Sequence, residues 1–207
     1  HPRLKIGPYL EMASLRAVIL AFISLVAIAL PAHAQTSAED MVRRMAIDLT
    51  AEVRKNPDLA QSQAQLTSLA ERRLMPHFNF ERITQLAMGR NWAKASSAEQ
   101  RQIVSEFSKL LIRTYSNALA SLKDLNVQVR DSRKNGNDVT VRTHMSGRAK
   151  PVAIDYSLES SGGGWRVFDV TVEGLSLVTT YRDEFNGMIS SSGVSGLIAM
   201  LKQKNGK

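Results

Sequence analysis

The feature that most constrains the fold of this chain is a change in hydrophobic period. Apolar residues recur at helical spacing up to about position 124, alternate with polar residues over 125–172, and return to helical spacing after position 174. Alternating segments joined by short turns favour an antiparallel sheet with one apolar face. Helices set apart from such a sheet along the sequence define the α+β class, which is the fold class that we predict.

Six stretches with helical spacing flank this central region, and three of them follow residues that commonly cap helices. Ser37 and Asn79 each precede an apolar run, and Ser96 with Glu99 forms a capping box. The stretch after Ser96 has the clearest helical period in the chain, which predicts a long amphipathic helix. The predicted helices cover residues 37–49, 58–75, 80–88, 96–122, 177–189 and 194–203.

Four stretches alternate with a period of 2, as expected for strands that bury one face. Asn135-Gly136 marks a turn between two of them, and the run Gly162 to Gly164 marks another. No helix start follows the glycine run, so it fits a hairpin turn better than a phosphate-binding loop. The predicted strands cover residues 125–129, 139–145, 152–158 and 165–172.

The N-terminal region resembles a secretory signal. Arg16 precedes an uncharged apolar run over 17–30, and Ala32-His33-Ala34 supplies a cleavage sequence of small residues. Fourteen helical residues span about 21 Å, which is shorter than the hydrocarbon core of a bilayer. We therefore predict that residues 1–34 are upstream residues plus a signal peptide removed after Ala34, and that 35–207 form a single exported domain. An N-terminal membrane anchor is the alternative.

The charge balance is basic. The chain carries 27 Lys and Arg against 19 Asp and Glu, a formal charge of +8. Arg3, Lys5 and Arg16 against Glu11 contribute +2, so the predicted mature chain carries +6. Because an exported protein seldom meets chromosomal DNA, attraction to anionic surfaces is a better use of this charge than nucleic-acid binding. Solubility alone is an equally good explanation.

The sequence contains little material for catalysis. It has no cysteine, which excludes thiol nucleophiles, disulfides and cysteine-ligated metals. The histidines after Ala34 are His77 and His144, and His144 lies beside Arg142 on the polar side of its strand. No hydrolase, phosphate-loop or metalloprotease motif is present. We therefore predict no catalytic residue, no metal and no cofactor.

Asp169 is the one carboxylate that a catalytic hypothesis can use. It lies in the apolar stretch 167–170, and a buried aspartate can act as a general base in small cone-shaped α+β enzymes. An isomerase or dehydratase with Asp169 as base is therefore the alternative function. The plainer interpretation is that Asp169 hydrogen-bonds to backbone at the sheet edge or pairs with an arginine.

Three segments resemble one known family. The sequence over 165–185 (WRVFDVTVEGLSLVTTYRDEF) carries the most specific match, and the segments 78–92 and 107–115 add to it. In these segments, and over essentially the whole chain after Ala34, the protein resembles the MlaC family. Members of that family are periplasmic phospholipid carriers of the pathway that maintains lipid asymmetry of the outer membrane, and are also called toluene-tolerance auxiliary proteins.

The resemblance implies both a fold and a function. It implies a curved antiparallel sheet of four to five strands, wrapped by helices and enclosing a hydrophobic cavity for the acyl chains of a phospholipid. It also implies a periplasmic protein that shuttles lipid between an outer-membrane lipoprotein–porin complex and an inner-membrane ABC transporter with a ring-forming substrate-binding subunit. The family has no catalytic residues or cofactor to carry over, and phospholipid is the cargo.

The cavity lining is assigned from the parity of the strands and from the family's shape. For each residue taken alone, packing in the core without contact to the ligand is an equally good interpretation. Glu173, Gly174, Tyr181 and Arg182 are expected to hold the junction between the last strand and the next helix, with Gly174 at a positive φ. The residues expected to bind lipid are Leu86, Phe107, Leu111, Tyr115, Val127, Val141, Thr143, Ile154, Tyr156, Val170, Val172, Leu177 and Tyr181.

Overall fold

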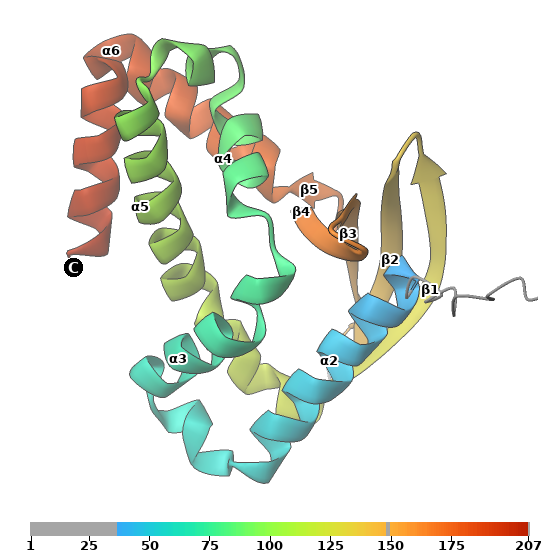
Figure 1. The fold of residues 1–207 in the computed structure, drawn as a ribbon. Coiled ribbons are helices and arrows are strands. Elements are labelled where there is room, and N and C mark those ends of the chain that lie inside the picture. The colour runs from blue at the N-terminus through green and yellow to red at the C-terminus, as the bar shows by residue number, and fades with distance from the viewer. Residues whose placement is uncertain (1–36, 148–149, 207) are drawn as a thin grey trace, which may run out of the picture. The chain divides into compact units, whose positions relative to one another are not determined.

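The computed structural model describes residues 37–147 and 150–206 and confirms the α+β class. The predicted signal peptide and its cleavage after Ala34 lie outside the described residues. Figure 1 shows the sheet flanked by helices. The strands pair in chain order and antiparallel: β1 (Asn126–Asn135), β2 (Asp138–Ser146), β3 (Val152–Ser161), β4 (Gly164–Val172) and β5 (Leu175–Ser176).

Five α-helices and four 3-10 helices account for most of the remaining described residues. The α-helices are α2 (Ala38–Lys55), α3 (Gln63–Arg73), α4 (Phe80–Met88), α5 (Ser97–Tyr115) and α6 (Leu177–Asn205). The 3-10 helices are η1 (Pro57–Gln61), η2 (Met75–His77), η3 (Gly89–Lys94) and η4 (Ser116–Asp124). Among residues 37–147 and 150–206, no helix combines the length and the apolar character needed to cross a membrane.

Side-chain caps begin the helices where the sequence predicted them. Ser37 and Asn79 accept hydrogen bonds from the first turns of α2 and α4. The capping box of α5 is complete, because Ser96 Oγ accepts from Glu99 N at 3.2 Å and Glu99 Oε2 accepts from Ser96 N at 2.8 Å. These caps satisfy backbone donors that have no partner inside the helix.

Several predicted helix boundaries were wrong. Helix α2 continues to Lys55 instead of ending at position 49, and the predicted break over 190–193 is a kink at Gly193 (φ +70°) inside the single helix α6. The second helix does not start at Asp58, because Pro57 opens the short 3-10 helix η1, and Ser62 then caps α3. The long helix after Ser96 is α-helical only to Tyr115, and η4 continues it to Asp124. Leu119 and Leu122 are three residues apart and both buried, a spacing that a 3-10 helix satisfies as well as an α-helix does.

The register of the sheet confirms that the predicted apolar residues share one face. Val141 pairs with Tyr156, and Tyr156 pairs with Val170, so their side chains point to the same side. β1 extends six residues beyond the predicted end at Val129 because its charged second half pairs with β2 up to the turn at Gly136. A register shift between Val129 and Asp131 interrupts the alternation in β1.

Three clusters of buried apolar residues form the core, and two of them pack against this face. One lies between α4, α5 and α6, a second joins α2, α3 and η4, and a third packs the start of α2 against the sheet. Phe78 packs against all three clusters, and the next residue, Asn79, donates its backbone N–H to the carbonyl of Val167 at 2.9 Å. The chain before α4 is therefore fixed to β4 at the point where the clusters meet.

The turn into α6 has two residues in the left-handed region. Glu173 has φ +48° and Gly174 has φ +83°, which confirms the predicted positive φ at Gly174. Glu173 exchanges hydrogen bonds with Ala153, as a backbone donor at 2.9 Å and a side-chain acceptor at 2.5 Å. Arg182 does not hold this junction; its Nε donates to the carbonyl of Leu86 at 2.9 Å and joins α6 to α4.

Candidate functional site

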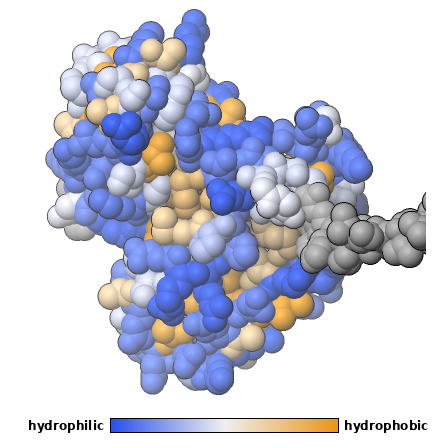
Figure 2. Space-filling view, viewed as in Figure 1, coloured by the Kyte–Doolittle hydropathy of each residue, from blue (hydrophilic) through white to orange (hydrophobic). Residues whose placement is uncertain are grey.

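A cavity of about 630 Å³ lies between the apolar face of the sheet and the helices. Figure 2 shows apolar residues gathered in a hollow on one face, with hydrophilic residues around it. Twenty-six residues line the cavity, and Asp169 and Glu173 are the charged ones, so no Lys or Arg contributes to its wall. The cavity volume is within the usual range of ligand sites, and its wall suits an apolar ligand.

Three large apolar side chains at the edge of the cavity are exposed to solvent. Leu175 is 75% exposed, Tyr115 48% and Val172 43%, and all three line the cavity. Val172 and Leu175 flank the β4–β5 turn, and Tyr115 ends α5. Exposed apolar side chains grouped at the edge of a cavity are typical of a site of contact with a ligand or a partner. We therefore place the mouth of the cavity between this turn and the end of α5.

Eight of the thirteen residues predicted to bind lipid line the cavity. They come from α5, from strands β1, β3 and β4, and from the start of α6, which are far apart in the sequence. Parity correctly placed the sheet residues among them on the inner face. Ligand contact at each position stays a prediction. The eight are Leu111, Tyr115, Val127, Ile154, Tyr156, Val170, Val172 and Leu177.

The other five lie in the core and do not line the cavity. Val141 and Thr143 are on the correct face, but both are fully buried, and Val141 packs against the first turns of α2. Phe107 and Tyr181 lie one helical turn beyond Leu111 and Leu177, where their rings pack edge to face at 4.8 Å. Leu86 packs against that same helical cluster. The predicted face therefore did not identify the cavity wall at these five positions, and ligand contact there stays a prediction.

The alternation of apolar residues along the strands did not identify the helical residues that form the opposite wall of the cavity. Met45 and Leu49 of α2, and Leu119 and Leu122 of η4, line the cavity although they were not among the residues predicted to bind lipid. Their periodic spacing showed that they face inward, but not that they face a space instead of another side chain. The sequence therefore indicated that these residues face inward, but it contained no pattern that indicated a cavity.

Asp169 is a structural residue of the turn into α6. Its Oδ1 accepts from the backbone N–H of Val170 at 2.8 Å and of Val178 at 3.1 Å, and its Oδ2 accepts from Ser176 Oγ at 2.5 Å. Ser176 Oγ in turn accepts from Thr179 N and caps the helix. Both carboxylate oxygens are thus engaged in holding α6 to β4, as the plainer interpretation of Asp169 predicted.

Within 37–147 and 150–206, no three His, Asp or Glu side chains are placed to hold a metal ion. His144 is exposed, as predicted from strand parity, and His77 is half-buried at the end of η2. The geometry therefore directs attention to the apolar cavity.

The hydroxyl of Tyr156, in the cavity wall, should make the stability of the protein depend on pH. Burial raises the pKa of Tyr156 to about 12. In the unfolded chain the hydroxyl of Tyr156 loses its proton near pH 10. The contribution of this hydroxyl to the free energy of unfolding is therefore complete below pH 10 and is lost as the pH rises through 12. Tyr156 should contribute about 2–3 kcal/mol to the fall in the free energy of unfolding over this range, and Tyr156→Phe should remove that contribution. Urea titrations at pH 8, 10 and 12 measure it; parallel pH curves for variant and wild type would refute the prediction.

An α+β fold that surrounds an apolar cavity with an apolar mouth defines a binding protein for a lipid-like ligand. Sequence comparison identifies the group to which it belongs. The family described as MlaC protein matches residues 43–203, and the chain belongs to this family, a family of phospholipid-binding transport proteins.

Individual relatives agree with this assignment. The intermembrane phospholipid transport system binding protein MlaC of Haemophilus influenzae is 23% identical over 180 residues, covering 83% of this chain and 84% of the relative. The toluene tolerance protein ttg2D of Pseudomonas putida is 26% identical over 180 residues, covering 85% and 81%. The solved phospholipid-binding protein of Ralstonia solanacearum, in complex with a phospholipid, is 36% identical with a TM-score of 0.77, covering 82% of this chain and 97% of that one.

Proposed function

We propose that this protein is a periplasmic carrier that holds the acyl chains of a phospholipid in its cavity. The observation that carries the proposal is the apolar cavity of about 630 Å³ with an exposed apolar mouth. A solved relative in complex with a phospholipid supports it. The predicted signal peptide supports export, and the carrier role requires no catalytic group.

The energetics explain why such a protein is needed. Each CH₂ group exposed to water costs about 0.8 kcal/mol, so a diacyl lipid with roughly thirty of them faces a cost on the order of 24 kcal/mol in free solution. A wall of aliphatic side chains replaces the bilayer interior at nearly equal free energy. Lipid can then enter or leave according to what the partner membranes offer.

The charges at the cavity indicate where the head group lies. Asp169 and Glu173 are acidic, and no basic side chain lines the wall. A phosphate deep in the cavity would lose its hydration without gaining a cation. We therefore infer that the head group stays in solvent at the mouth, beside Tyr115 and Leu175, and that the acyl chains enter first.

The test of cargo is direct. The protein is purified without detergent, extracted with organic solvent, and the extract is analysed by mass spectrometry. We expect about one phospholipid per protein, and uptake of fluorescent phospholipid from vesicles after delipidation. An extract free of phospholipid, together with no uptake from vesicles, would exclude the carrier function.

The route is a finer part of the same proposal. We expect the loaded protein to exchange lipid with an outer-membrane lipoprotein–porin complex and with an inner-membrane ABC transporter that has a ring-forming substrate-binding subunit. Transfer of labelled lipid is measured into vesicles with and without each reconstituted complex. Equal transfer rates with and without both complexes would contradict this route.

A further inference from the structure

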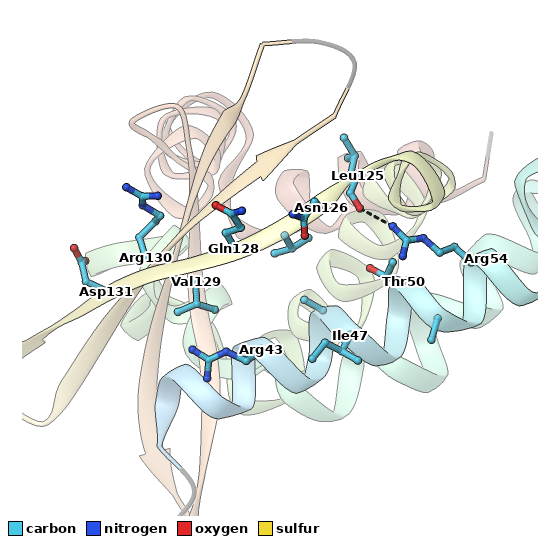
Figure 3. Close-up of a pocket in the computed structure, with 13 residues that line it drawn as sticks. Arg43, Ile47, Thr50, Arg54, Leu125, Asn126, Gln128, Val129, Arg130 and Asp131 are labelled. Carbon is cyan, nitrogen blue, oxygen red and sulfur yellow. Dashed lines mark hydrogen bonds between the residues drawn. The ribbon is translucent and has the colours of Figure 1, made fainter.

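A second concave region lies outside the cavity, between helix α2 and strand β1. This groove has a volume of about 700 Å³. Figure 3 shows its two sides, with Arg43, Ile47 and Arg54 on α2 and the residues around Gln128 on β1. The groove shares Ala46 and Val127 with the wall of the lipid cavity, but its other lining residues, among them Arg54 and Arg130, are not part of that wall.

The β1 side of the groove exposes backbone as well as side chains. Seven consecutive residues, 125–131, line it. Successive side chains of a strand point to opposite faces, so consecutive lining means that the edge of the strand itself faces the groove. β1 is the first strand of the sheet, and among the described residues it pairs only with β2. About 20 Å of strand edge is therefore open to a further strand.

The groove carries unneutralised positive charge. The carboxylate of Asp131 is bound by Arg142, which holds the pKa of Asp131 below its usual value. Arg43 pairs with Asp40 at 2.9 Å. Within the described part of the chain, neither Arg54 nor Arg130 forms an ion pair. Arg54 donates only to backbone carbonyls, those of residues 123 and 125, both at 3.2 Å.

An apolar side chain also lines the groove. Ile47 is 58% exposed and lines the groove from α2. An added strand would place alternate side chains toward α2, where Ile47 offers apolar contact and Arg54 a positive charge, and the others on the opposite face, where acidic residues meet Arg130. A second copy of this chain fits less well, because β1 paired with β1 would bring basic strands together.

We propose that the groove between α2 and β1 binds an extended acidic segment of a partner protein by adding it as a strand to the edge of β1. The concave shape and the open backbone edge fit a polypeptide rather than the flat surface of an anionic membrane. The competing explanation is that Arg130 and the register shift beside it protect the edge from pairing. That explanation predicts that no peptide binds.

The probe is a fluorescent ten-residue peptide of alternating Glu and Val, titrated into the purified protein by anisotropy. We expect saturable binding that weakens with salt, and NMR shifts of the amides of 125–131. The same peptide with every second amide N-methylated keeps its charge but loses one hydrogen-bonding edge, and should not bind. A peptide of alternating Lys and Val should not bind either.

Variants of the groove and a matched control complete the test. Arg54→Gln/Arg130→Gln should weaken binding of the acidic peptide about tenfold. Arg44→Gln/Arg101→Gln removes two exposed arginines outside the groove and should leave binding unchanged. Because Arg54 also bonds to backbone, the salt dependence of the wild-type protein provides a measurement that is independent of any variant's fold.

Several results would overturn the proposal. These are absence of peptide binding, equal binding of the N-methylated peptide, or NMR shifts confined to another surface. Self-association that is lost in Arg54→Gln/Arg130→Gln would assign the groove to a second copy. Binding to vesicles of anionic lipid that depends on these arginines, without peptide binding, would assign it to a membrane.

Discussion

The double variant Ile154→Trp/Val170→Trp is expected to fold but to lose at least tenfold in bound phospholipid. Ile154 of β3 and Val170 of β4 are diagonal neighbours on the inner face and both line the cavity. Two indole rings there occupy space that the acyl chains need. Because they fill a cavity instead of a close-packed core, we expect an unfolding free energy lower by at most about 2 kcal/mol. Phospholipid in organic extracts, measured by mass spectrometry, gives the loading.

The control for this prediction lies on the same strand. Val152 is two residues before Ile154, so its side chain points to the same side, but it is 36% exposed and does not line the cavity. Val152→Trp should therefore load lipid as the wild type does. Normal loading of the double variant would show that the ligand lies elsewhere. Equal loss in Val152→Trp would show that bulk on this strand disturbs the fold.

The sequence predicted the architecture well because hydrophobic period reports which face of an element is buried. Each of the four predicted strands lies within a strand of the structure or extends one residue beyond it, and the inner face from Val127 to Val172 follows parity. Hydrophobic period did not predict the parts of the sheet that are defined only by backbone pairing. The second half of β1 is polar yet paired with β2, and β5 has only two residues, Leu175 and Ser176.

The cavity was harder to predict for a related reason. An inward-facing residue can pack against another element or face a space, and period is the same in both cases. Val141 and Ile154 lie on the same inner face of adjacent strands, but α2 covers Val141, whereas Ile154 lines the cavity. The distinction depends on where α2 crosses the sheet. That crossing is a tertiary property that no local pattern encodes.

Arg82 is the residue whose loss is expected to destabilise the protein most. Its guanidinium donates to Asp138 at 2.9 and 3.1 Å and to Glu159 at 2.7 Å. It also lies 3.6 Å from the ring centroid of Phe168. Hydrogen bonding to Asp138 raises the pKa of Arg82 above its ordinary value. One side chain from α4 thus holds β2, β3 and β4 together, and α4 also contributes to the cavity wall.

Arg82→Met is expected to lower the free energy of unfolding by about 2–3 kcal/mol, because it leaves two partly buried carboxylates unpaired and close together. The three side chains are 28%, 32% and 19% exposed, for Arg82, Asp138 and Glu159, so solvent screens the charges only in part. Methionine keeps apolar contact with Phe168, which separates the loss of charge from the loss of packing. Urea unfolding at pH 7 measures the change.

Two further variants identify the cause of this loss. Arg82→Met/Asp138→Asn/Glu159→Gln removes the unpaired charges and should recover more than half of the lost stability. Arg142→Ala breaks the ion pair with Asp131 on the same sheet, where both side chains are about half exposed, and should have little effect. If the triple variant recovers nothing, packing rather than charge accounts for the role of Arg82. Because α4 also supplies Phe80 and Ile83 to the cavity wall, Arg82→Met should retain phospholipid less well than Arg142→Ala.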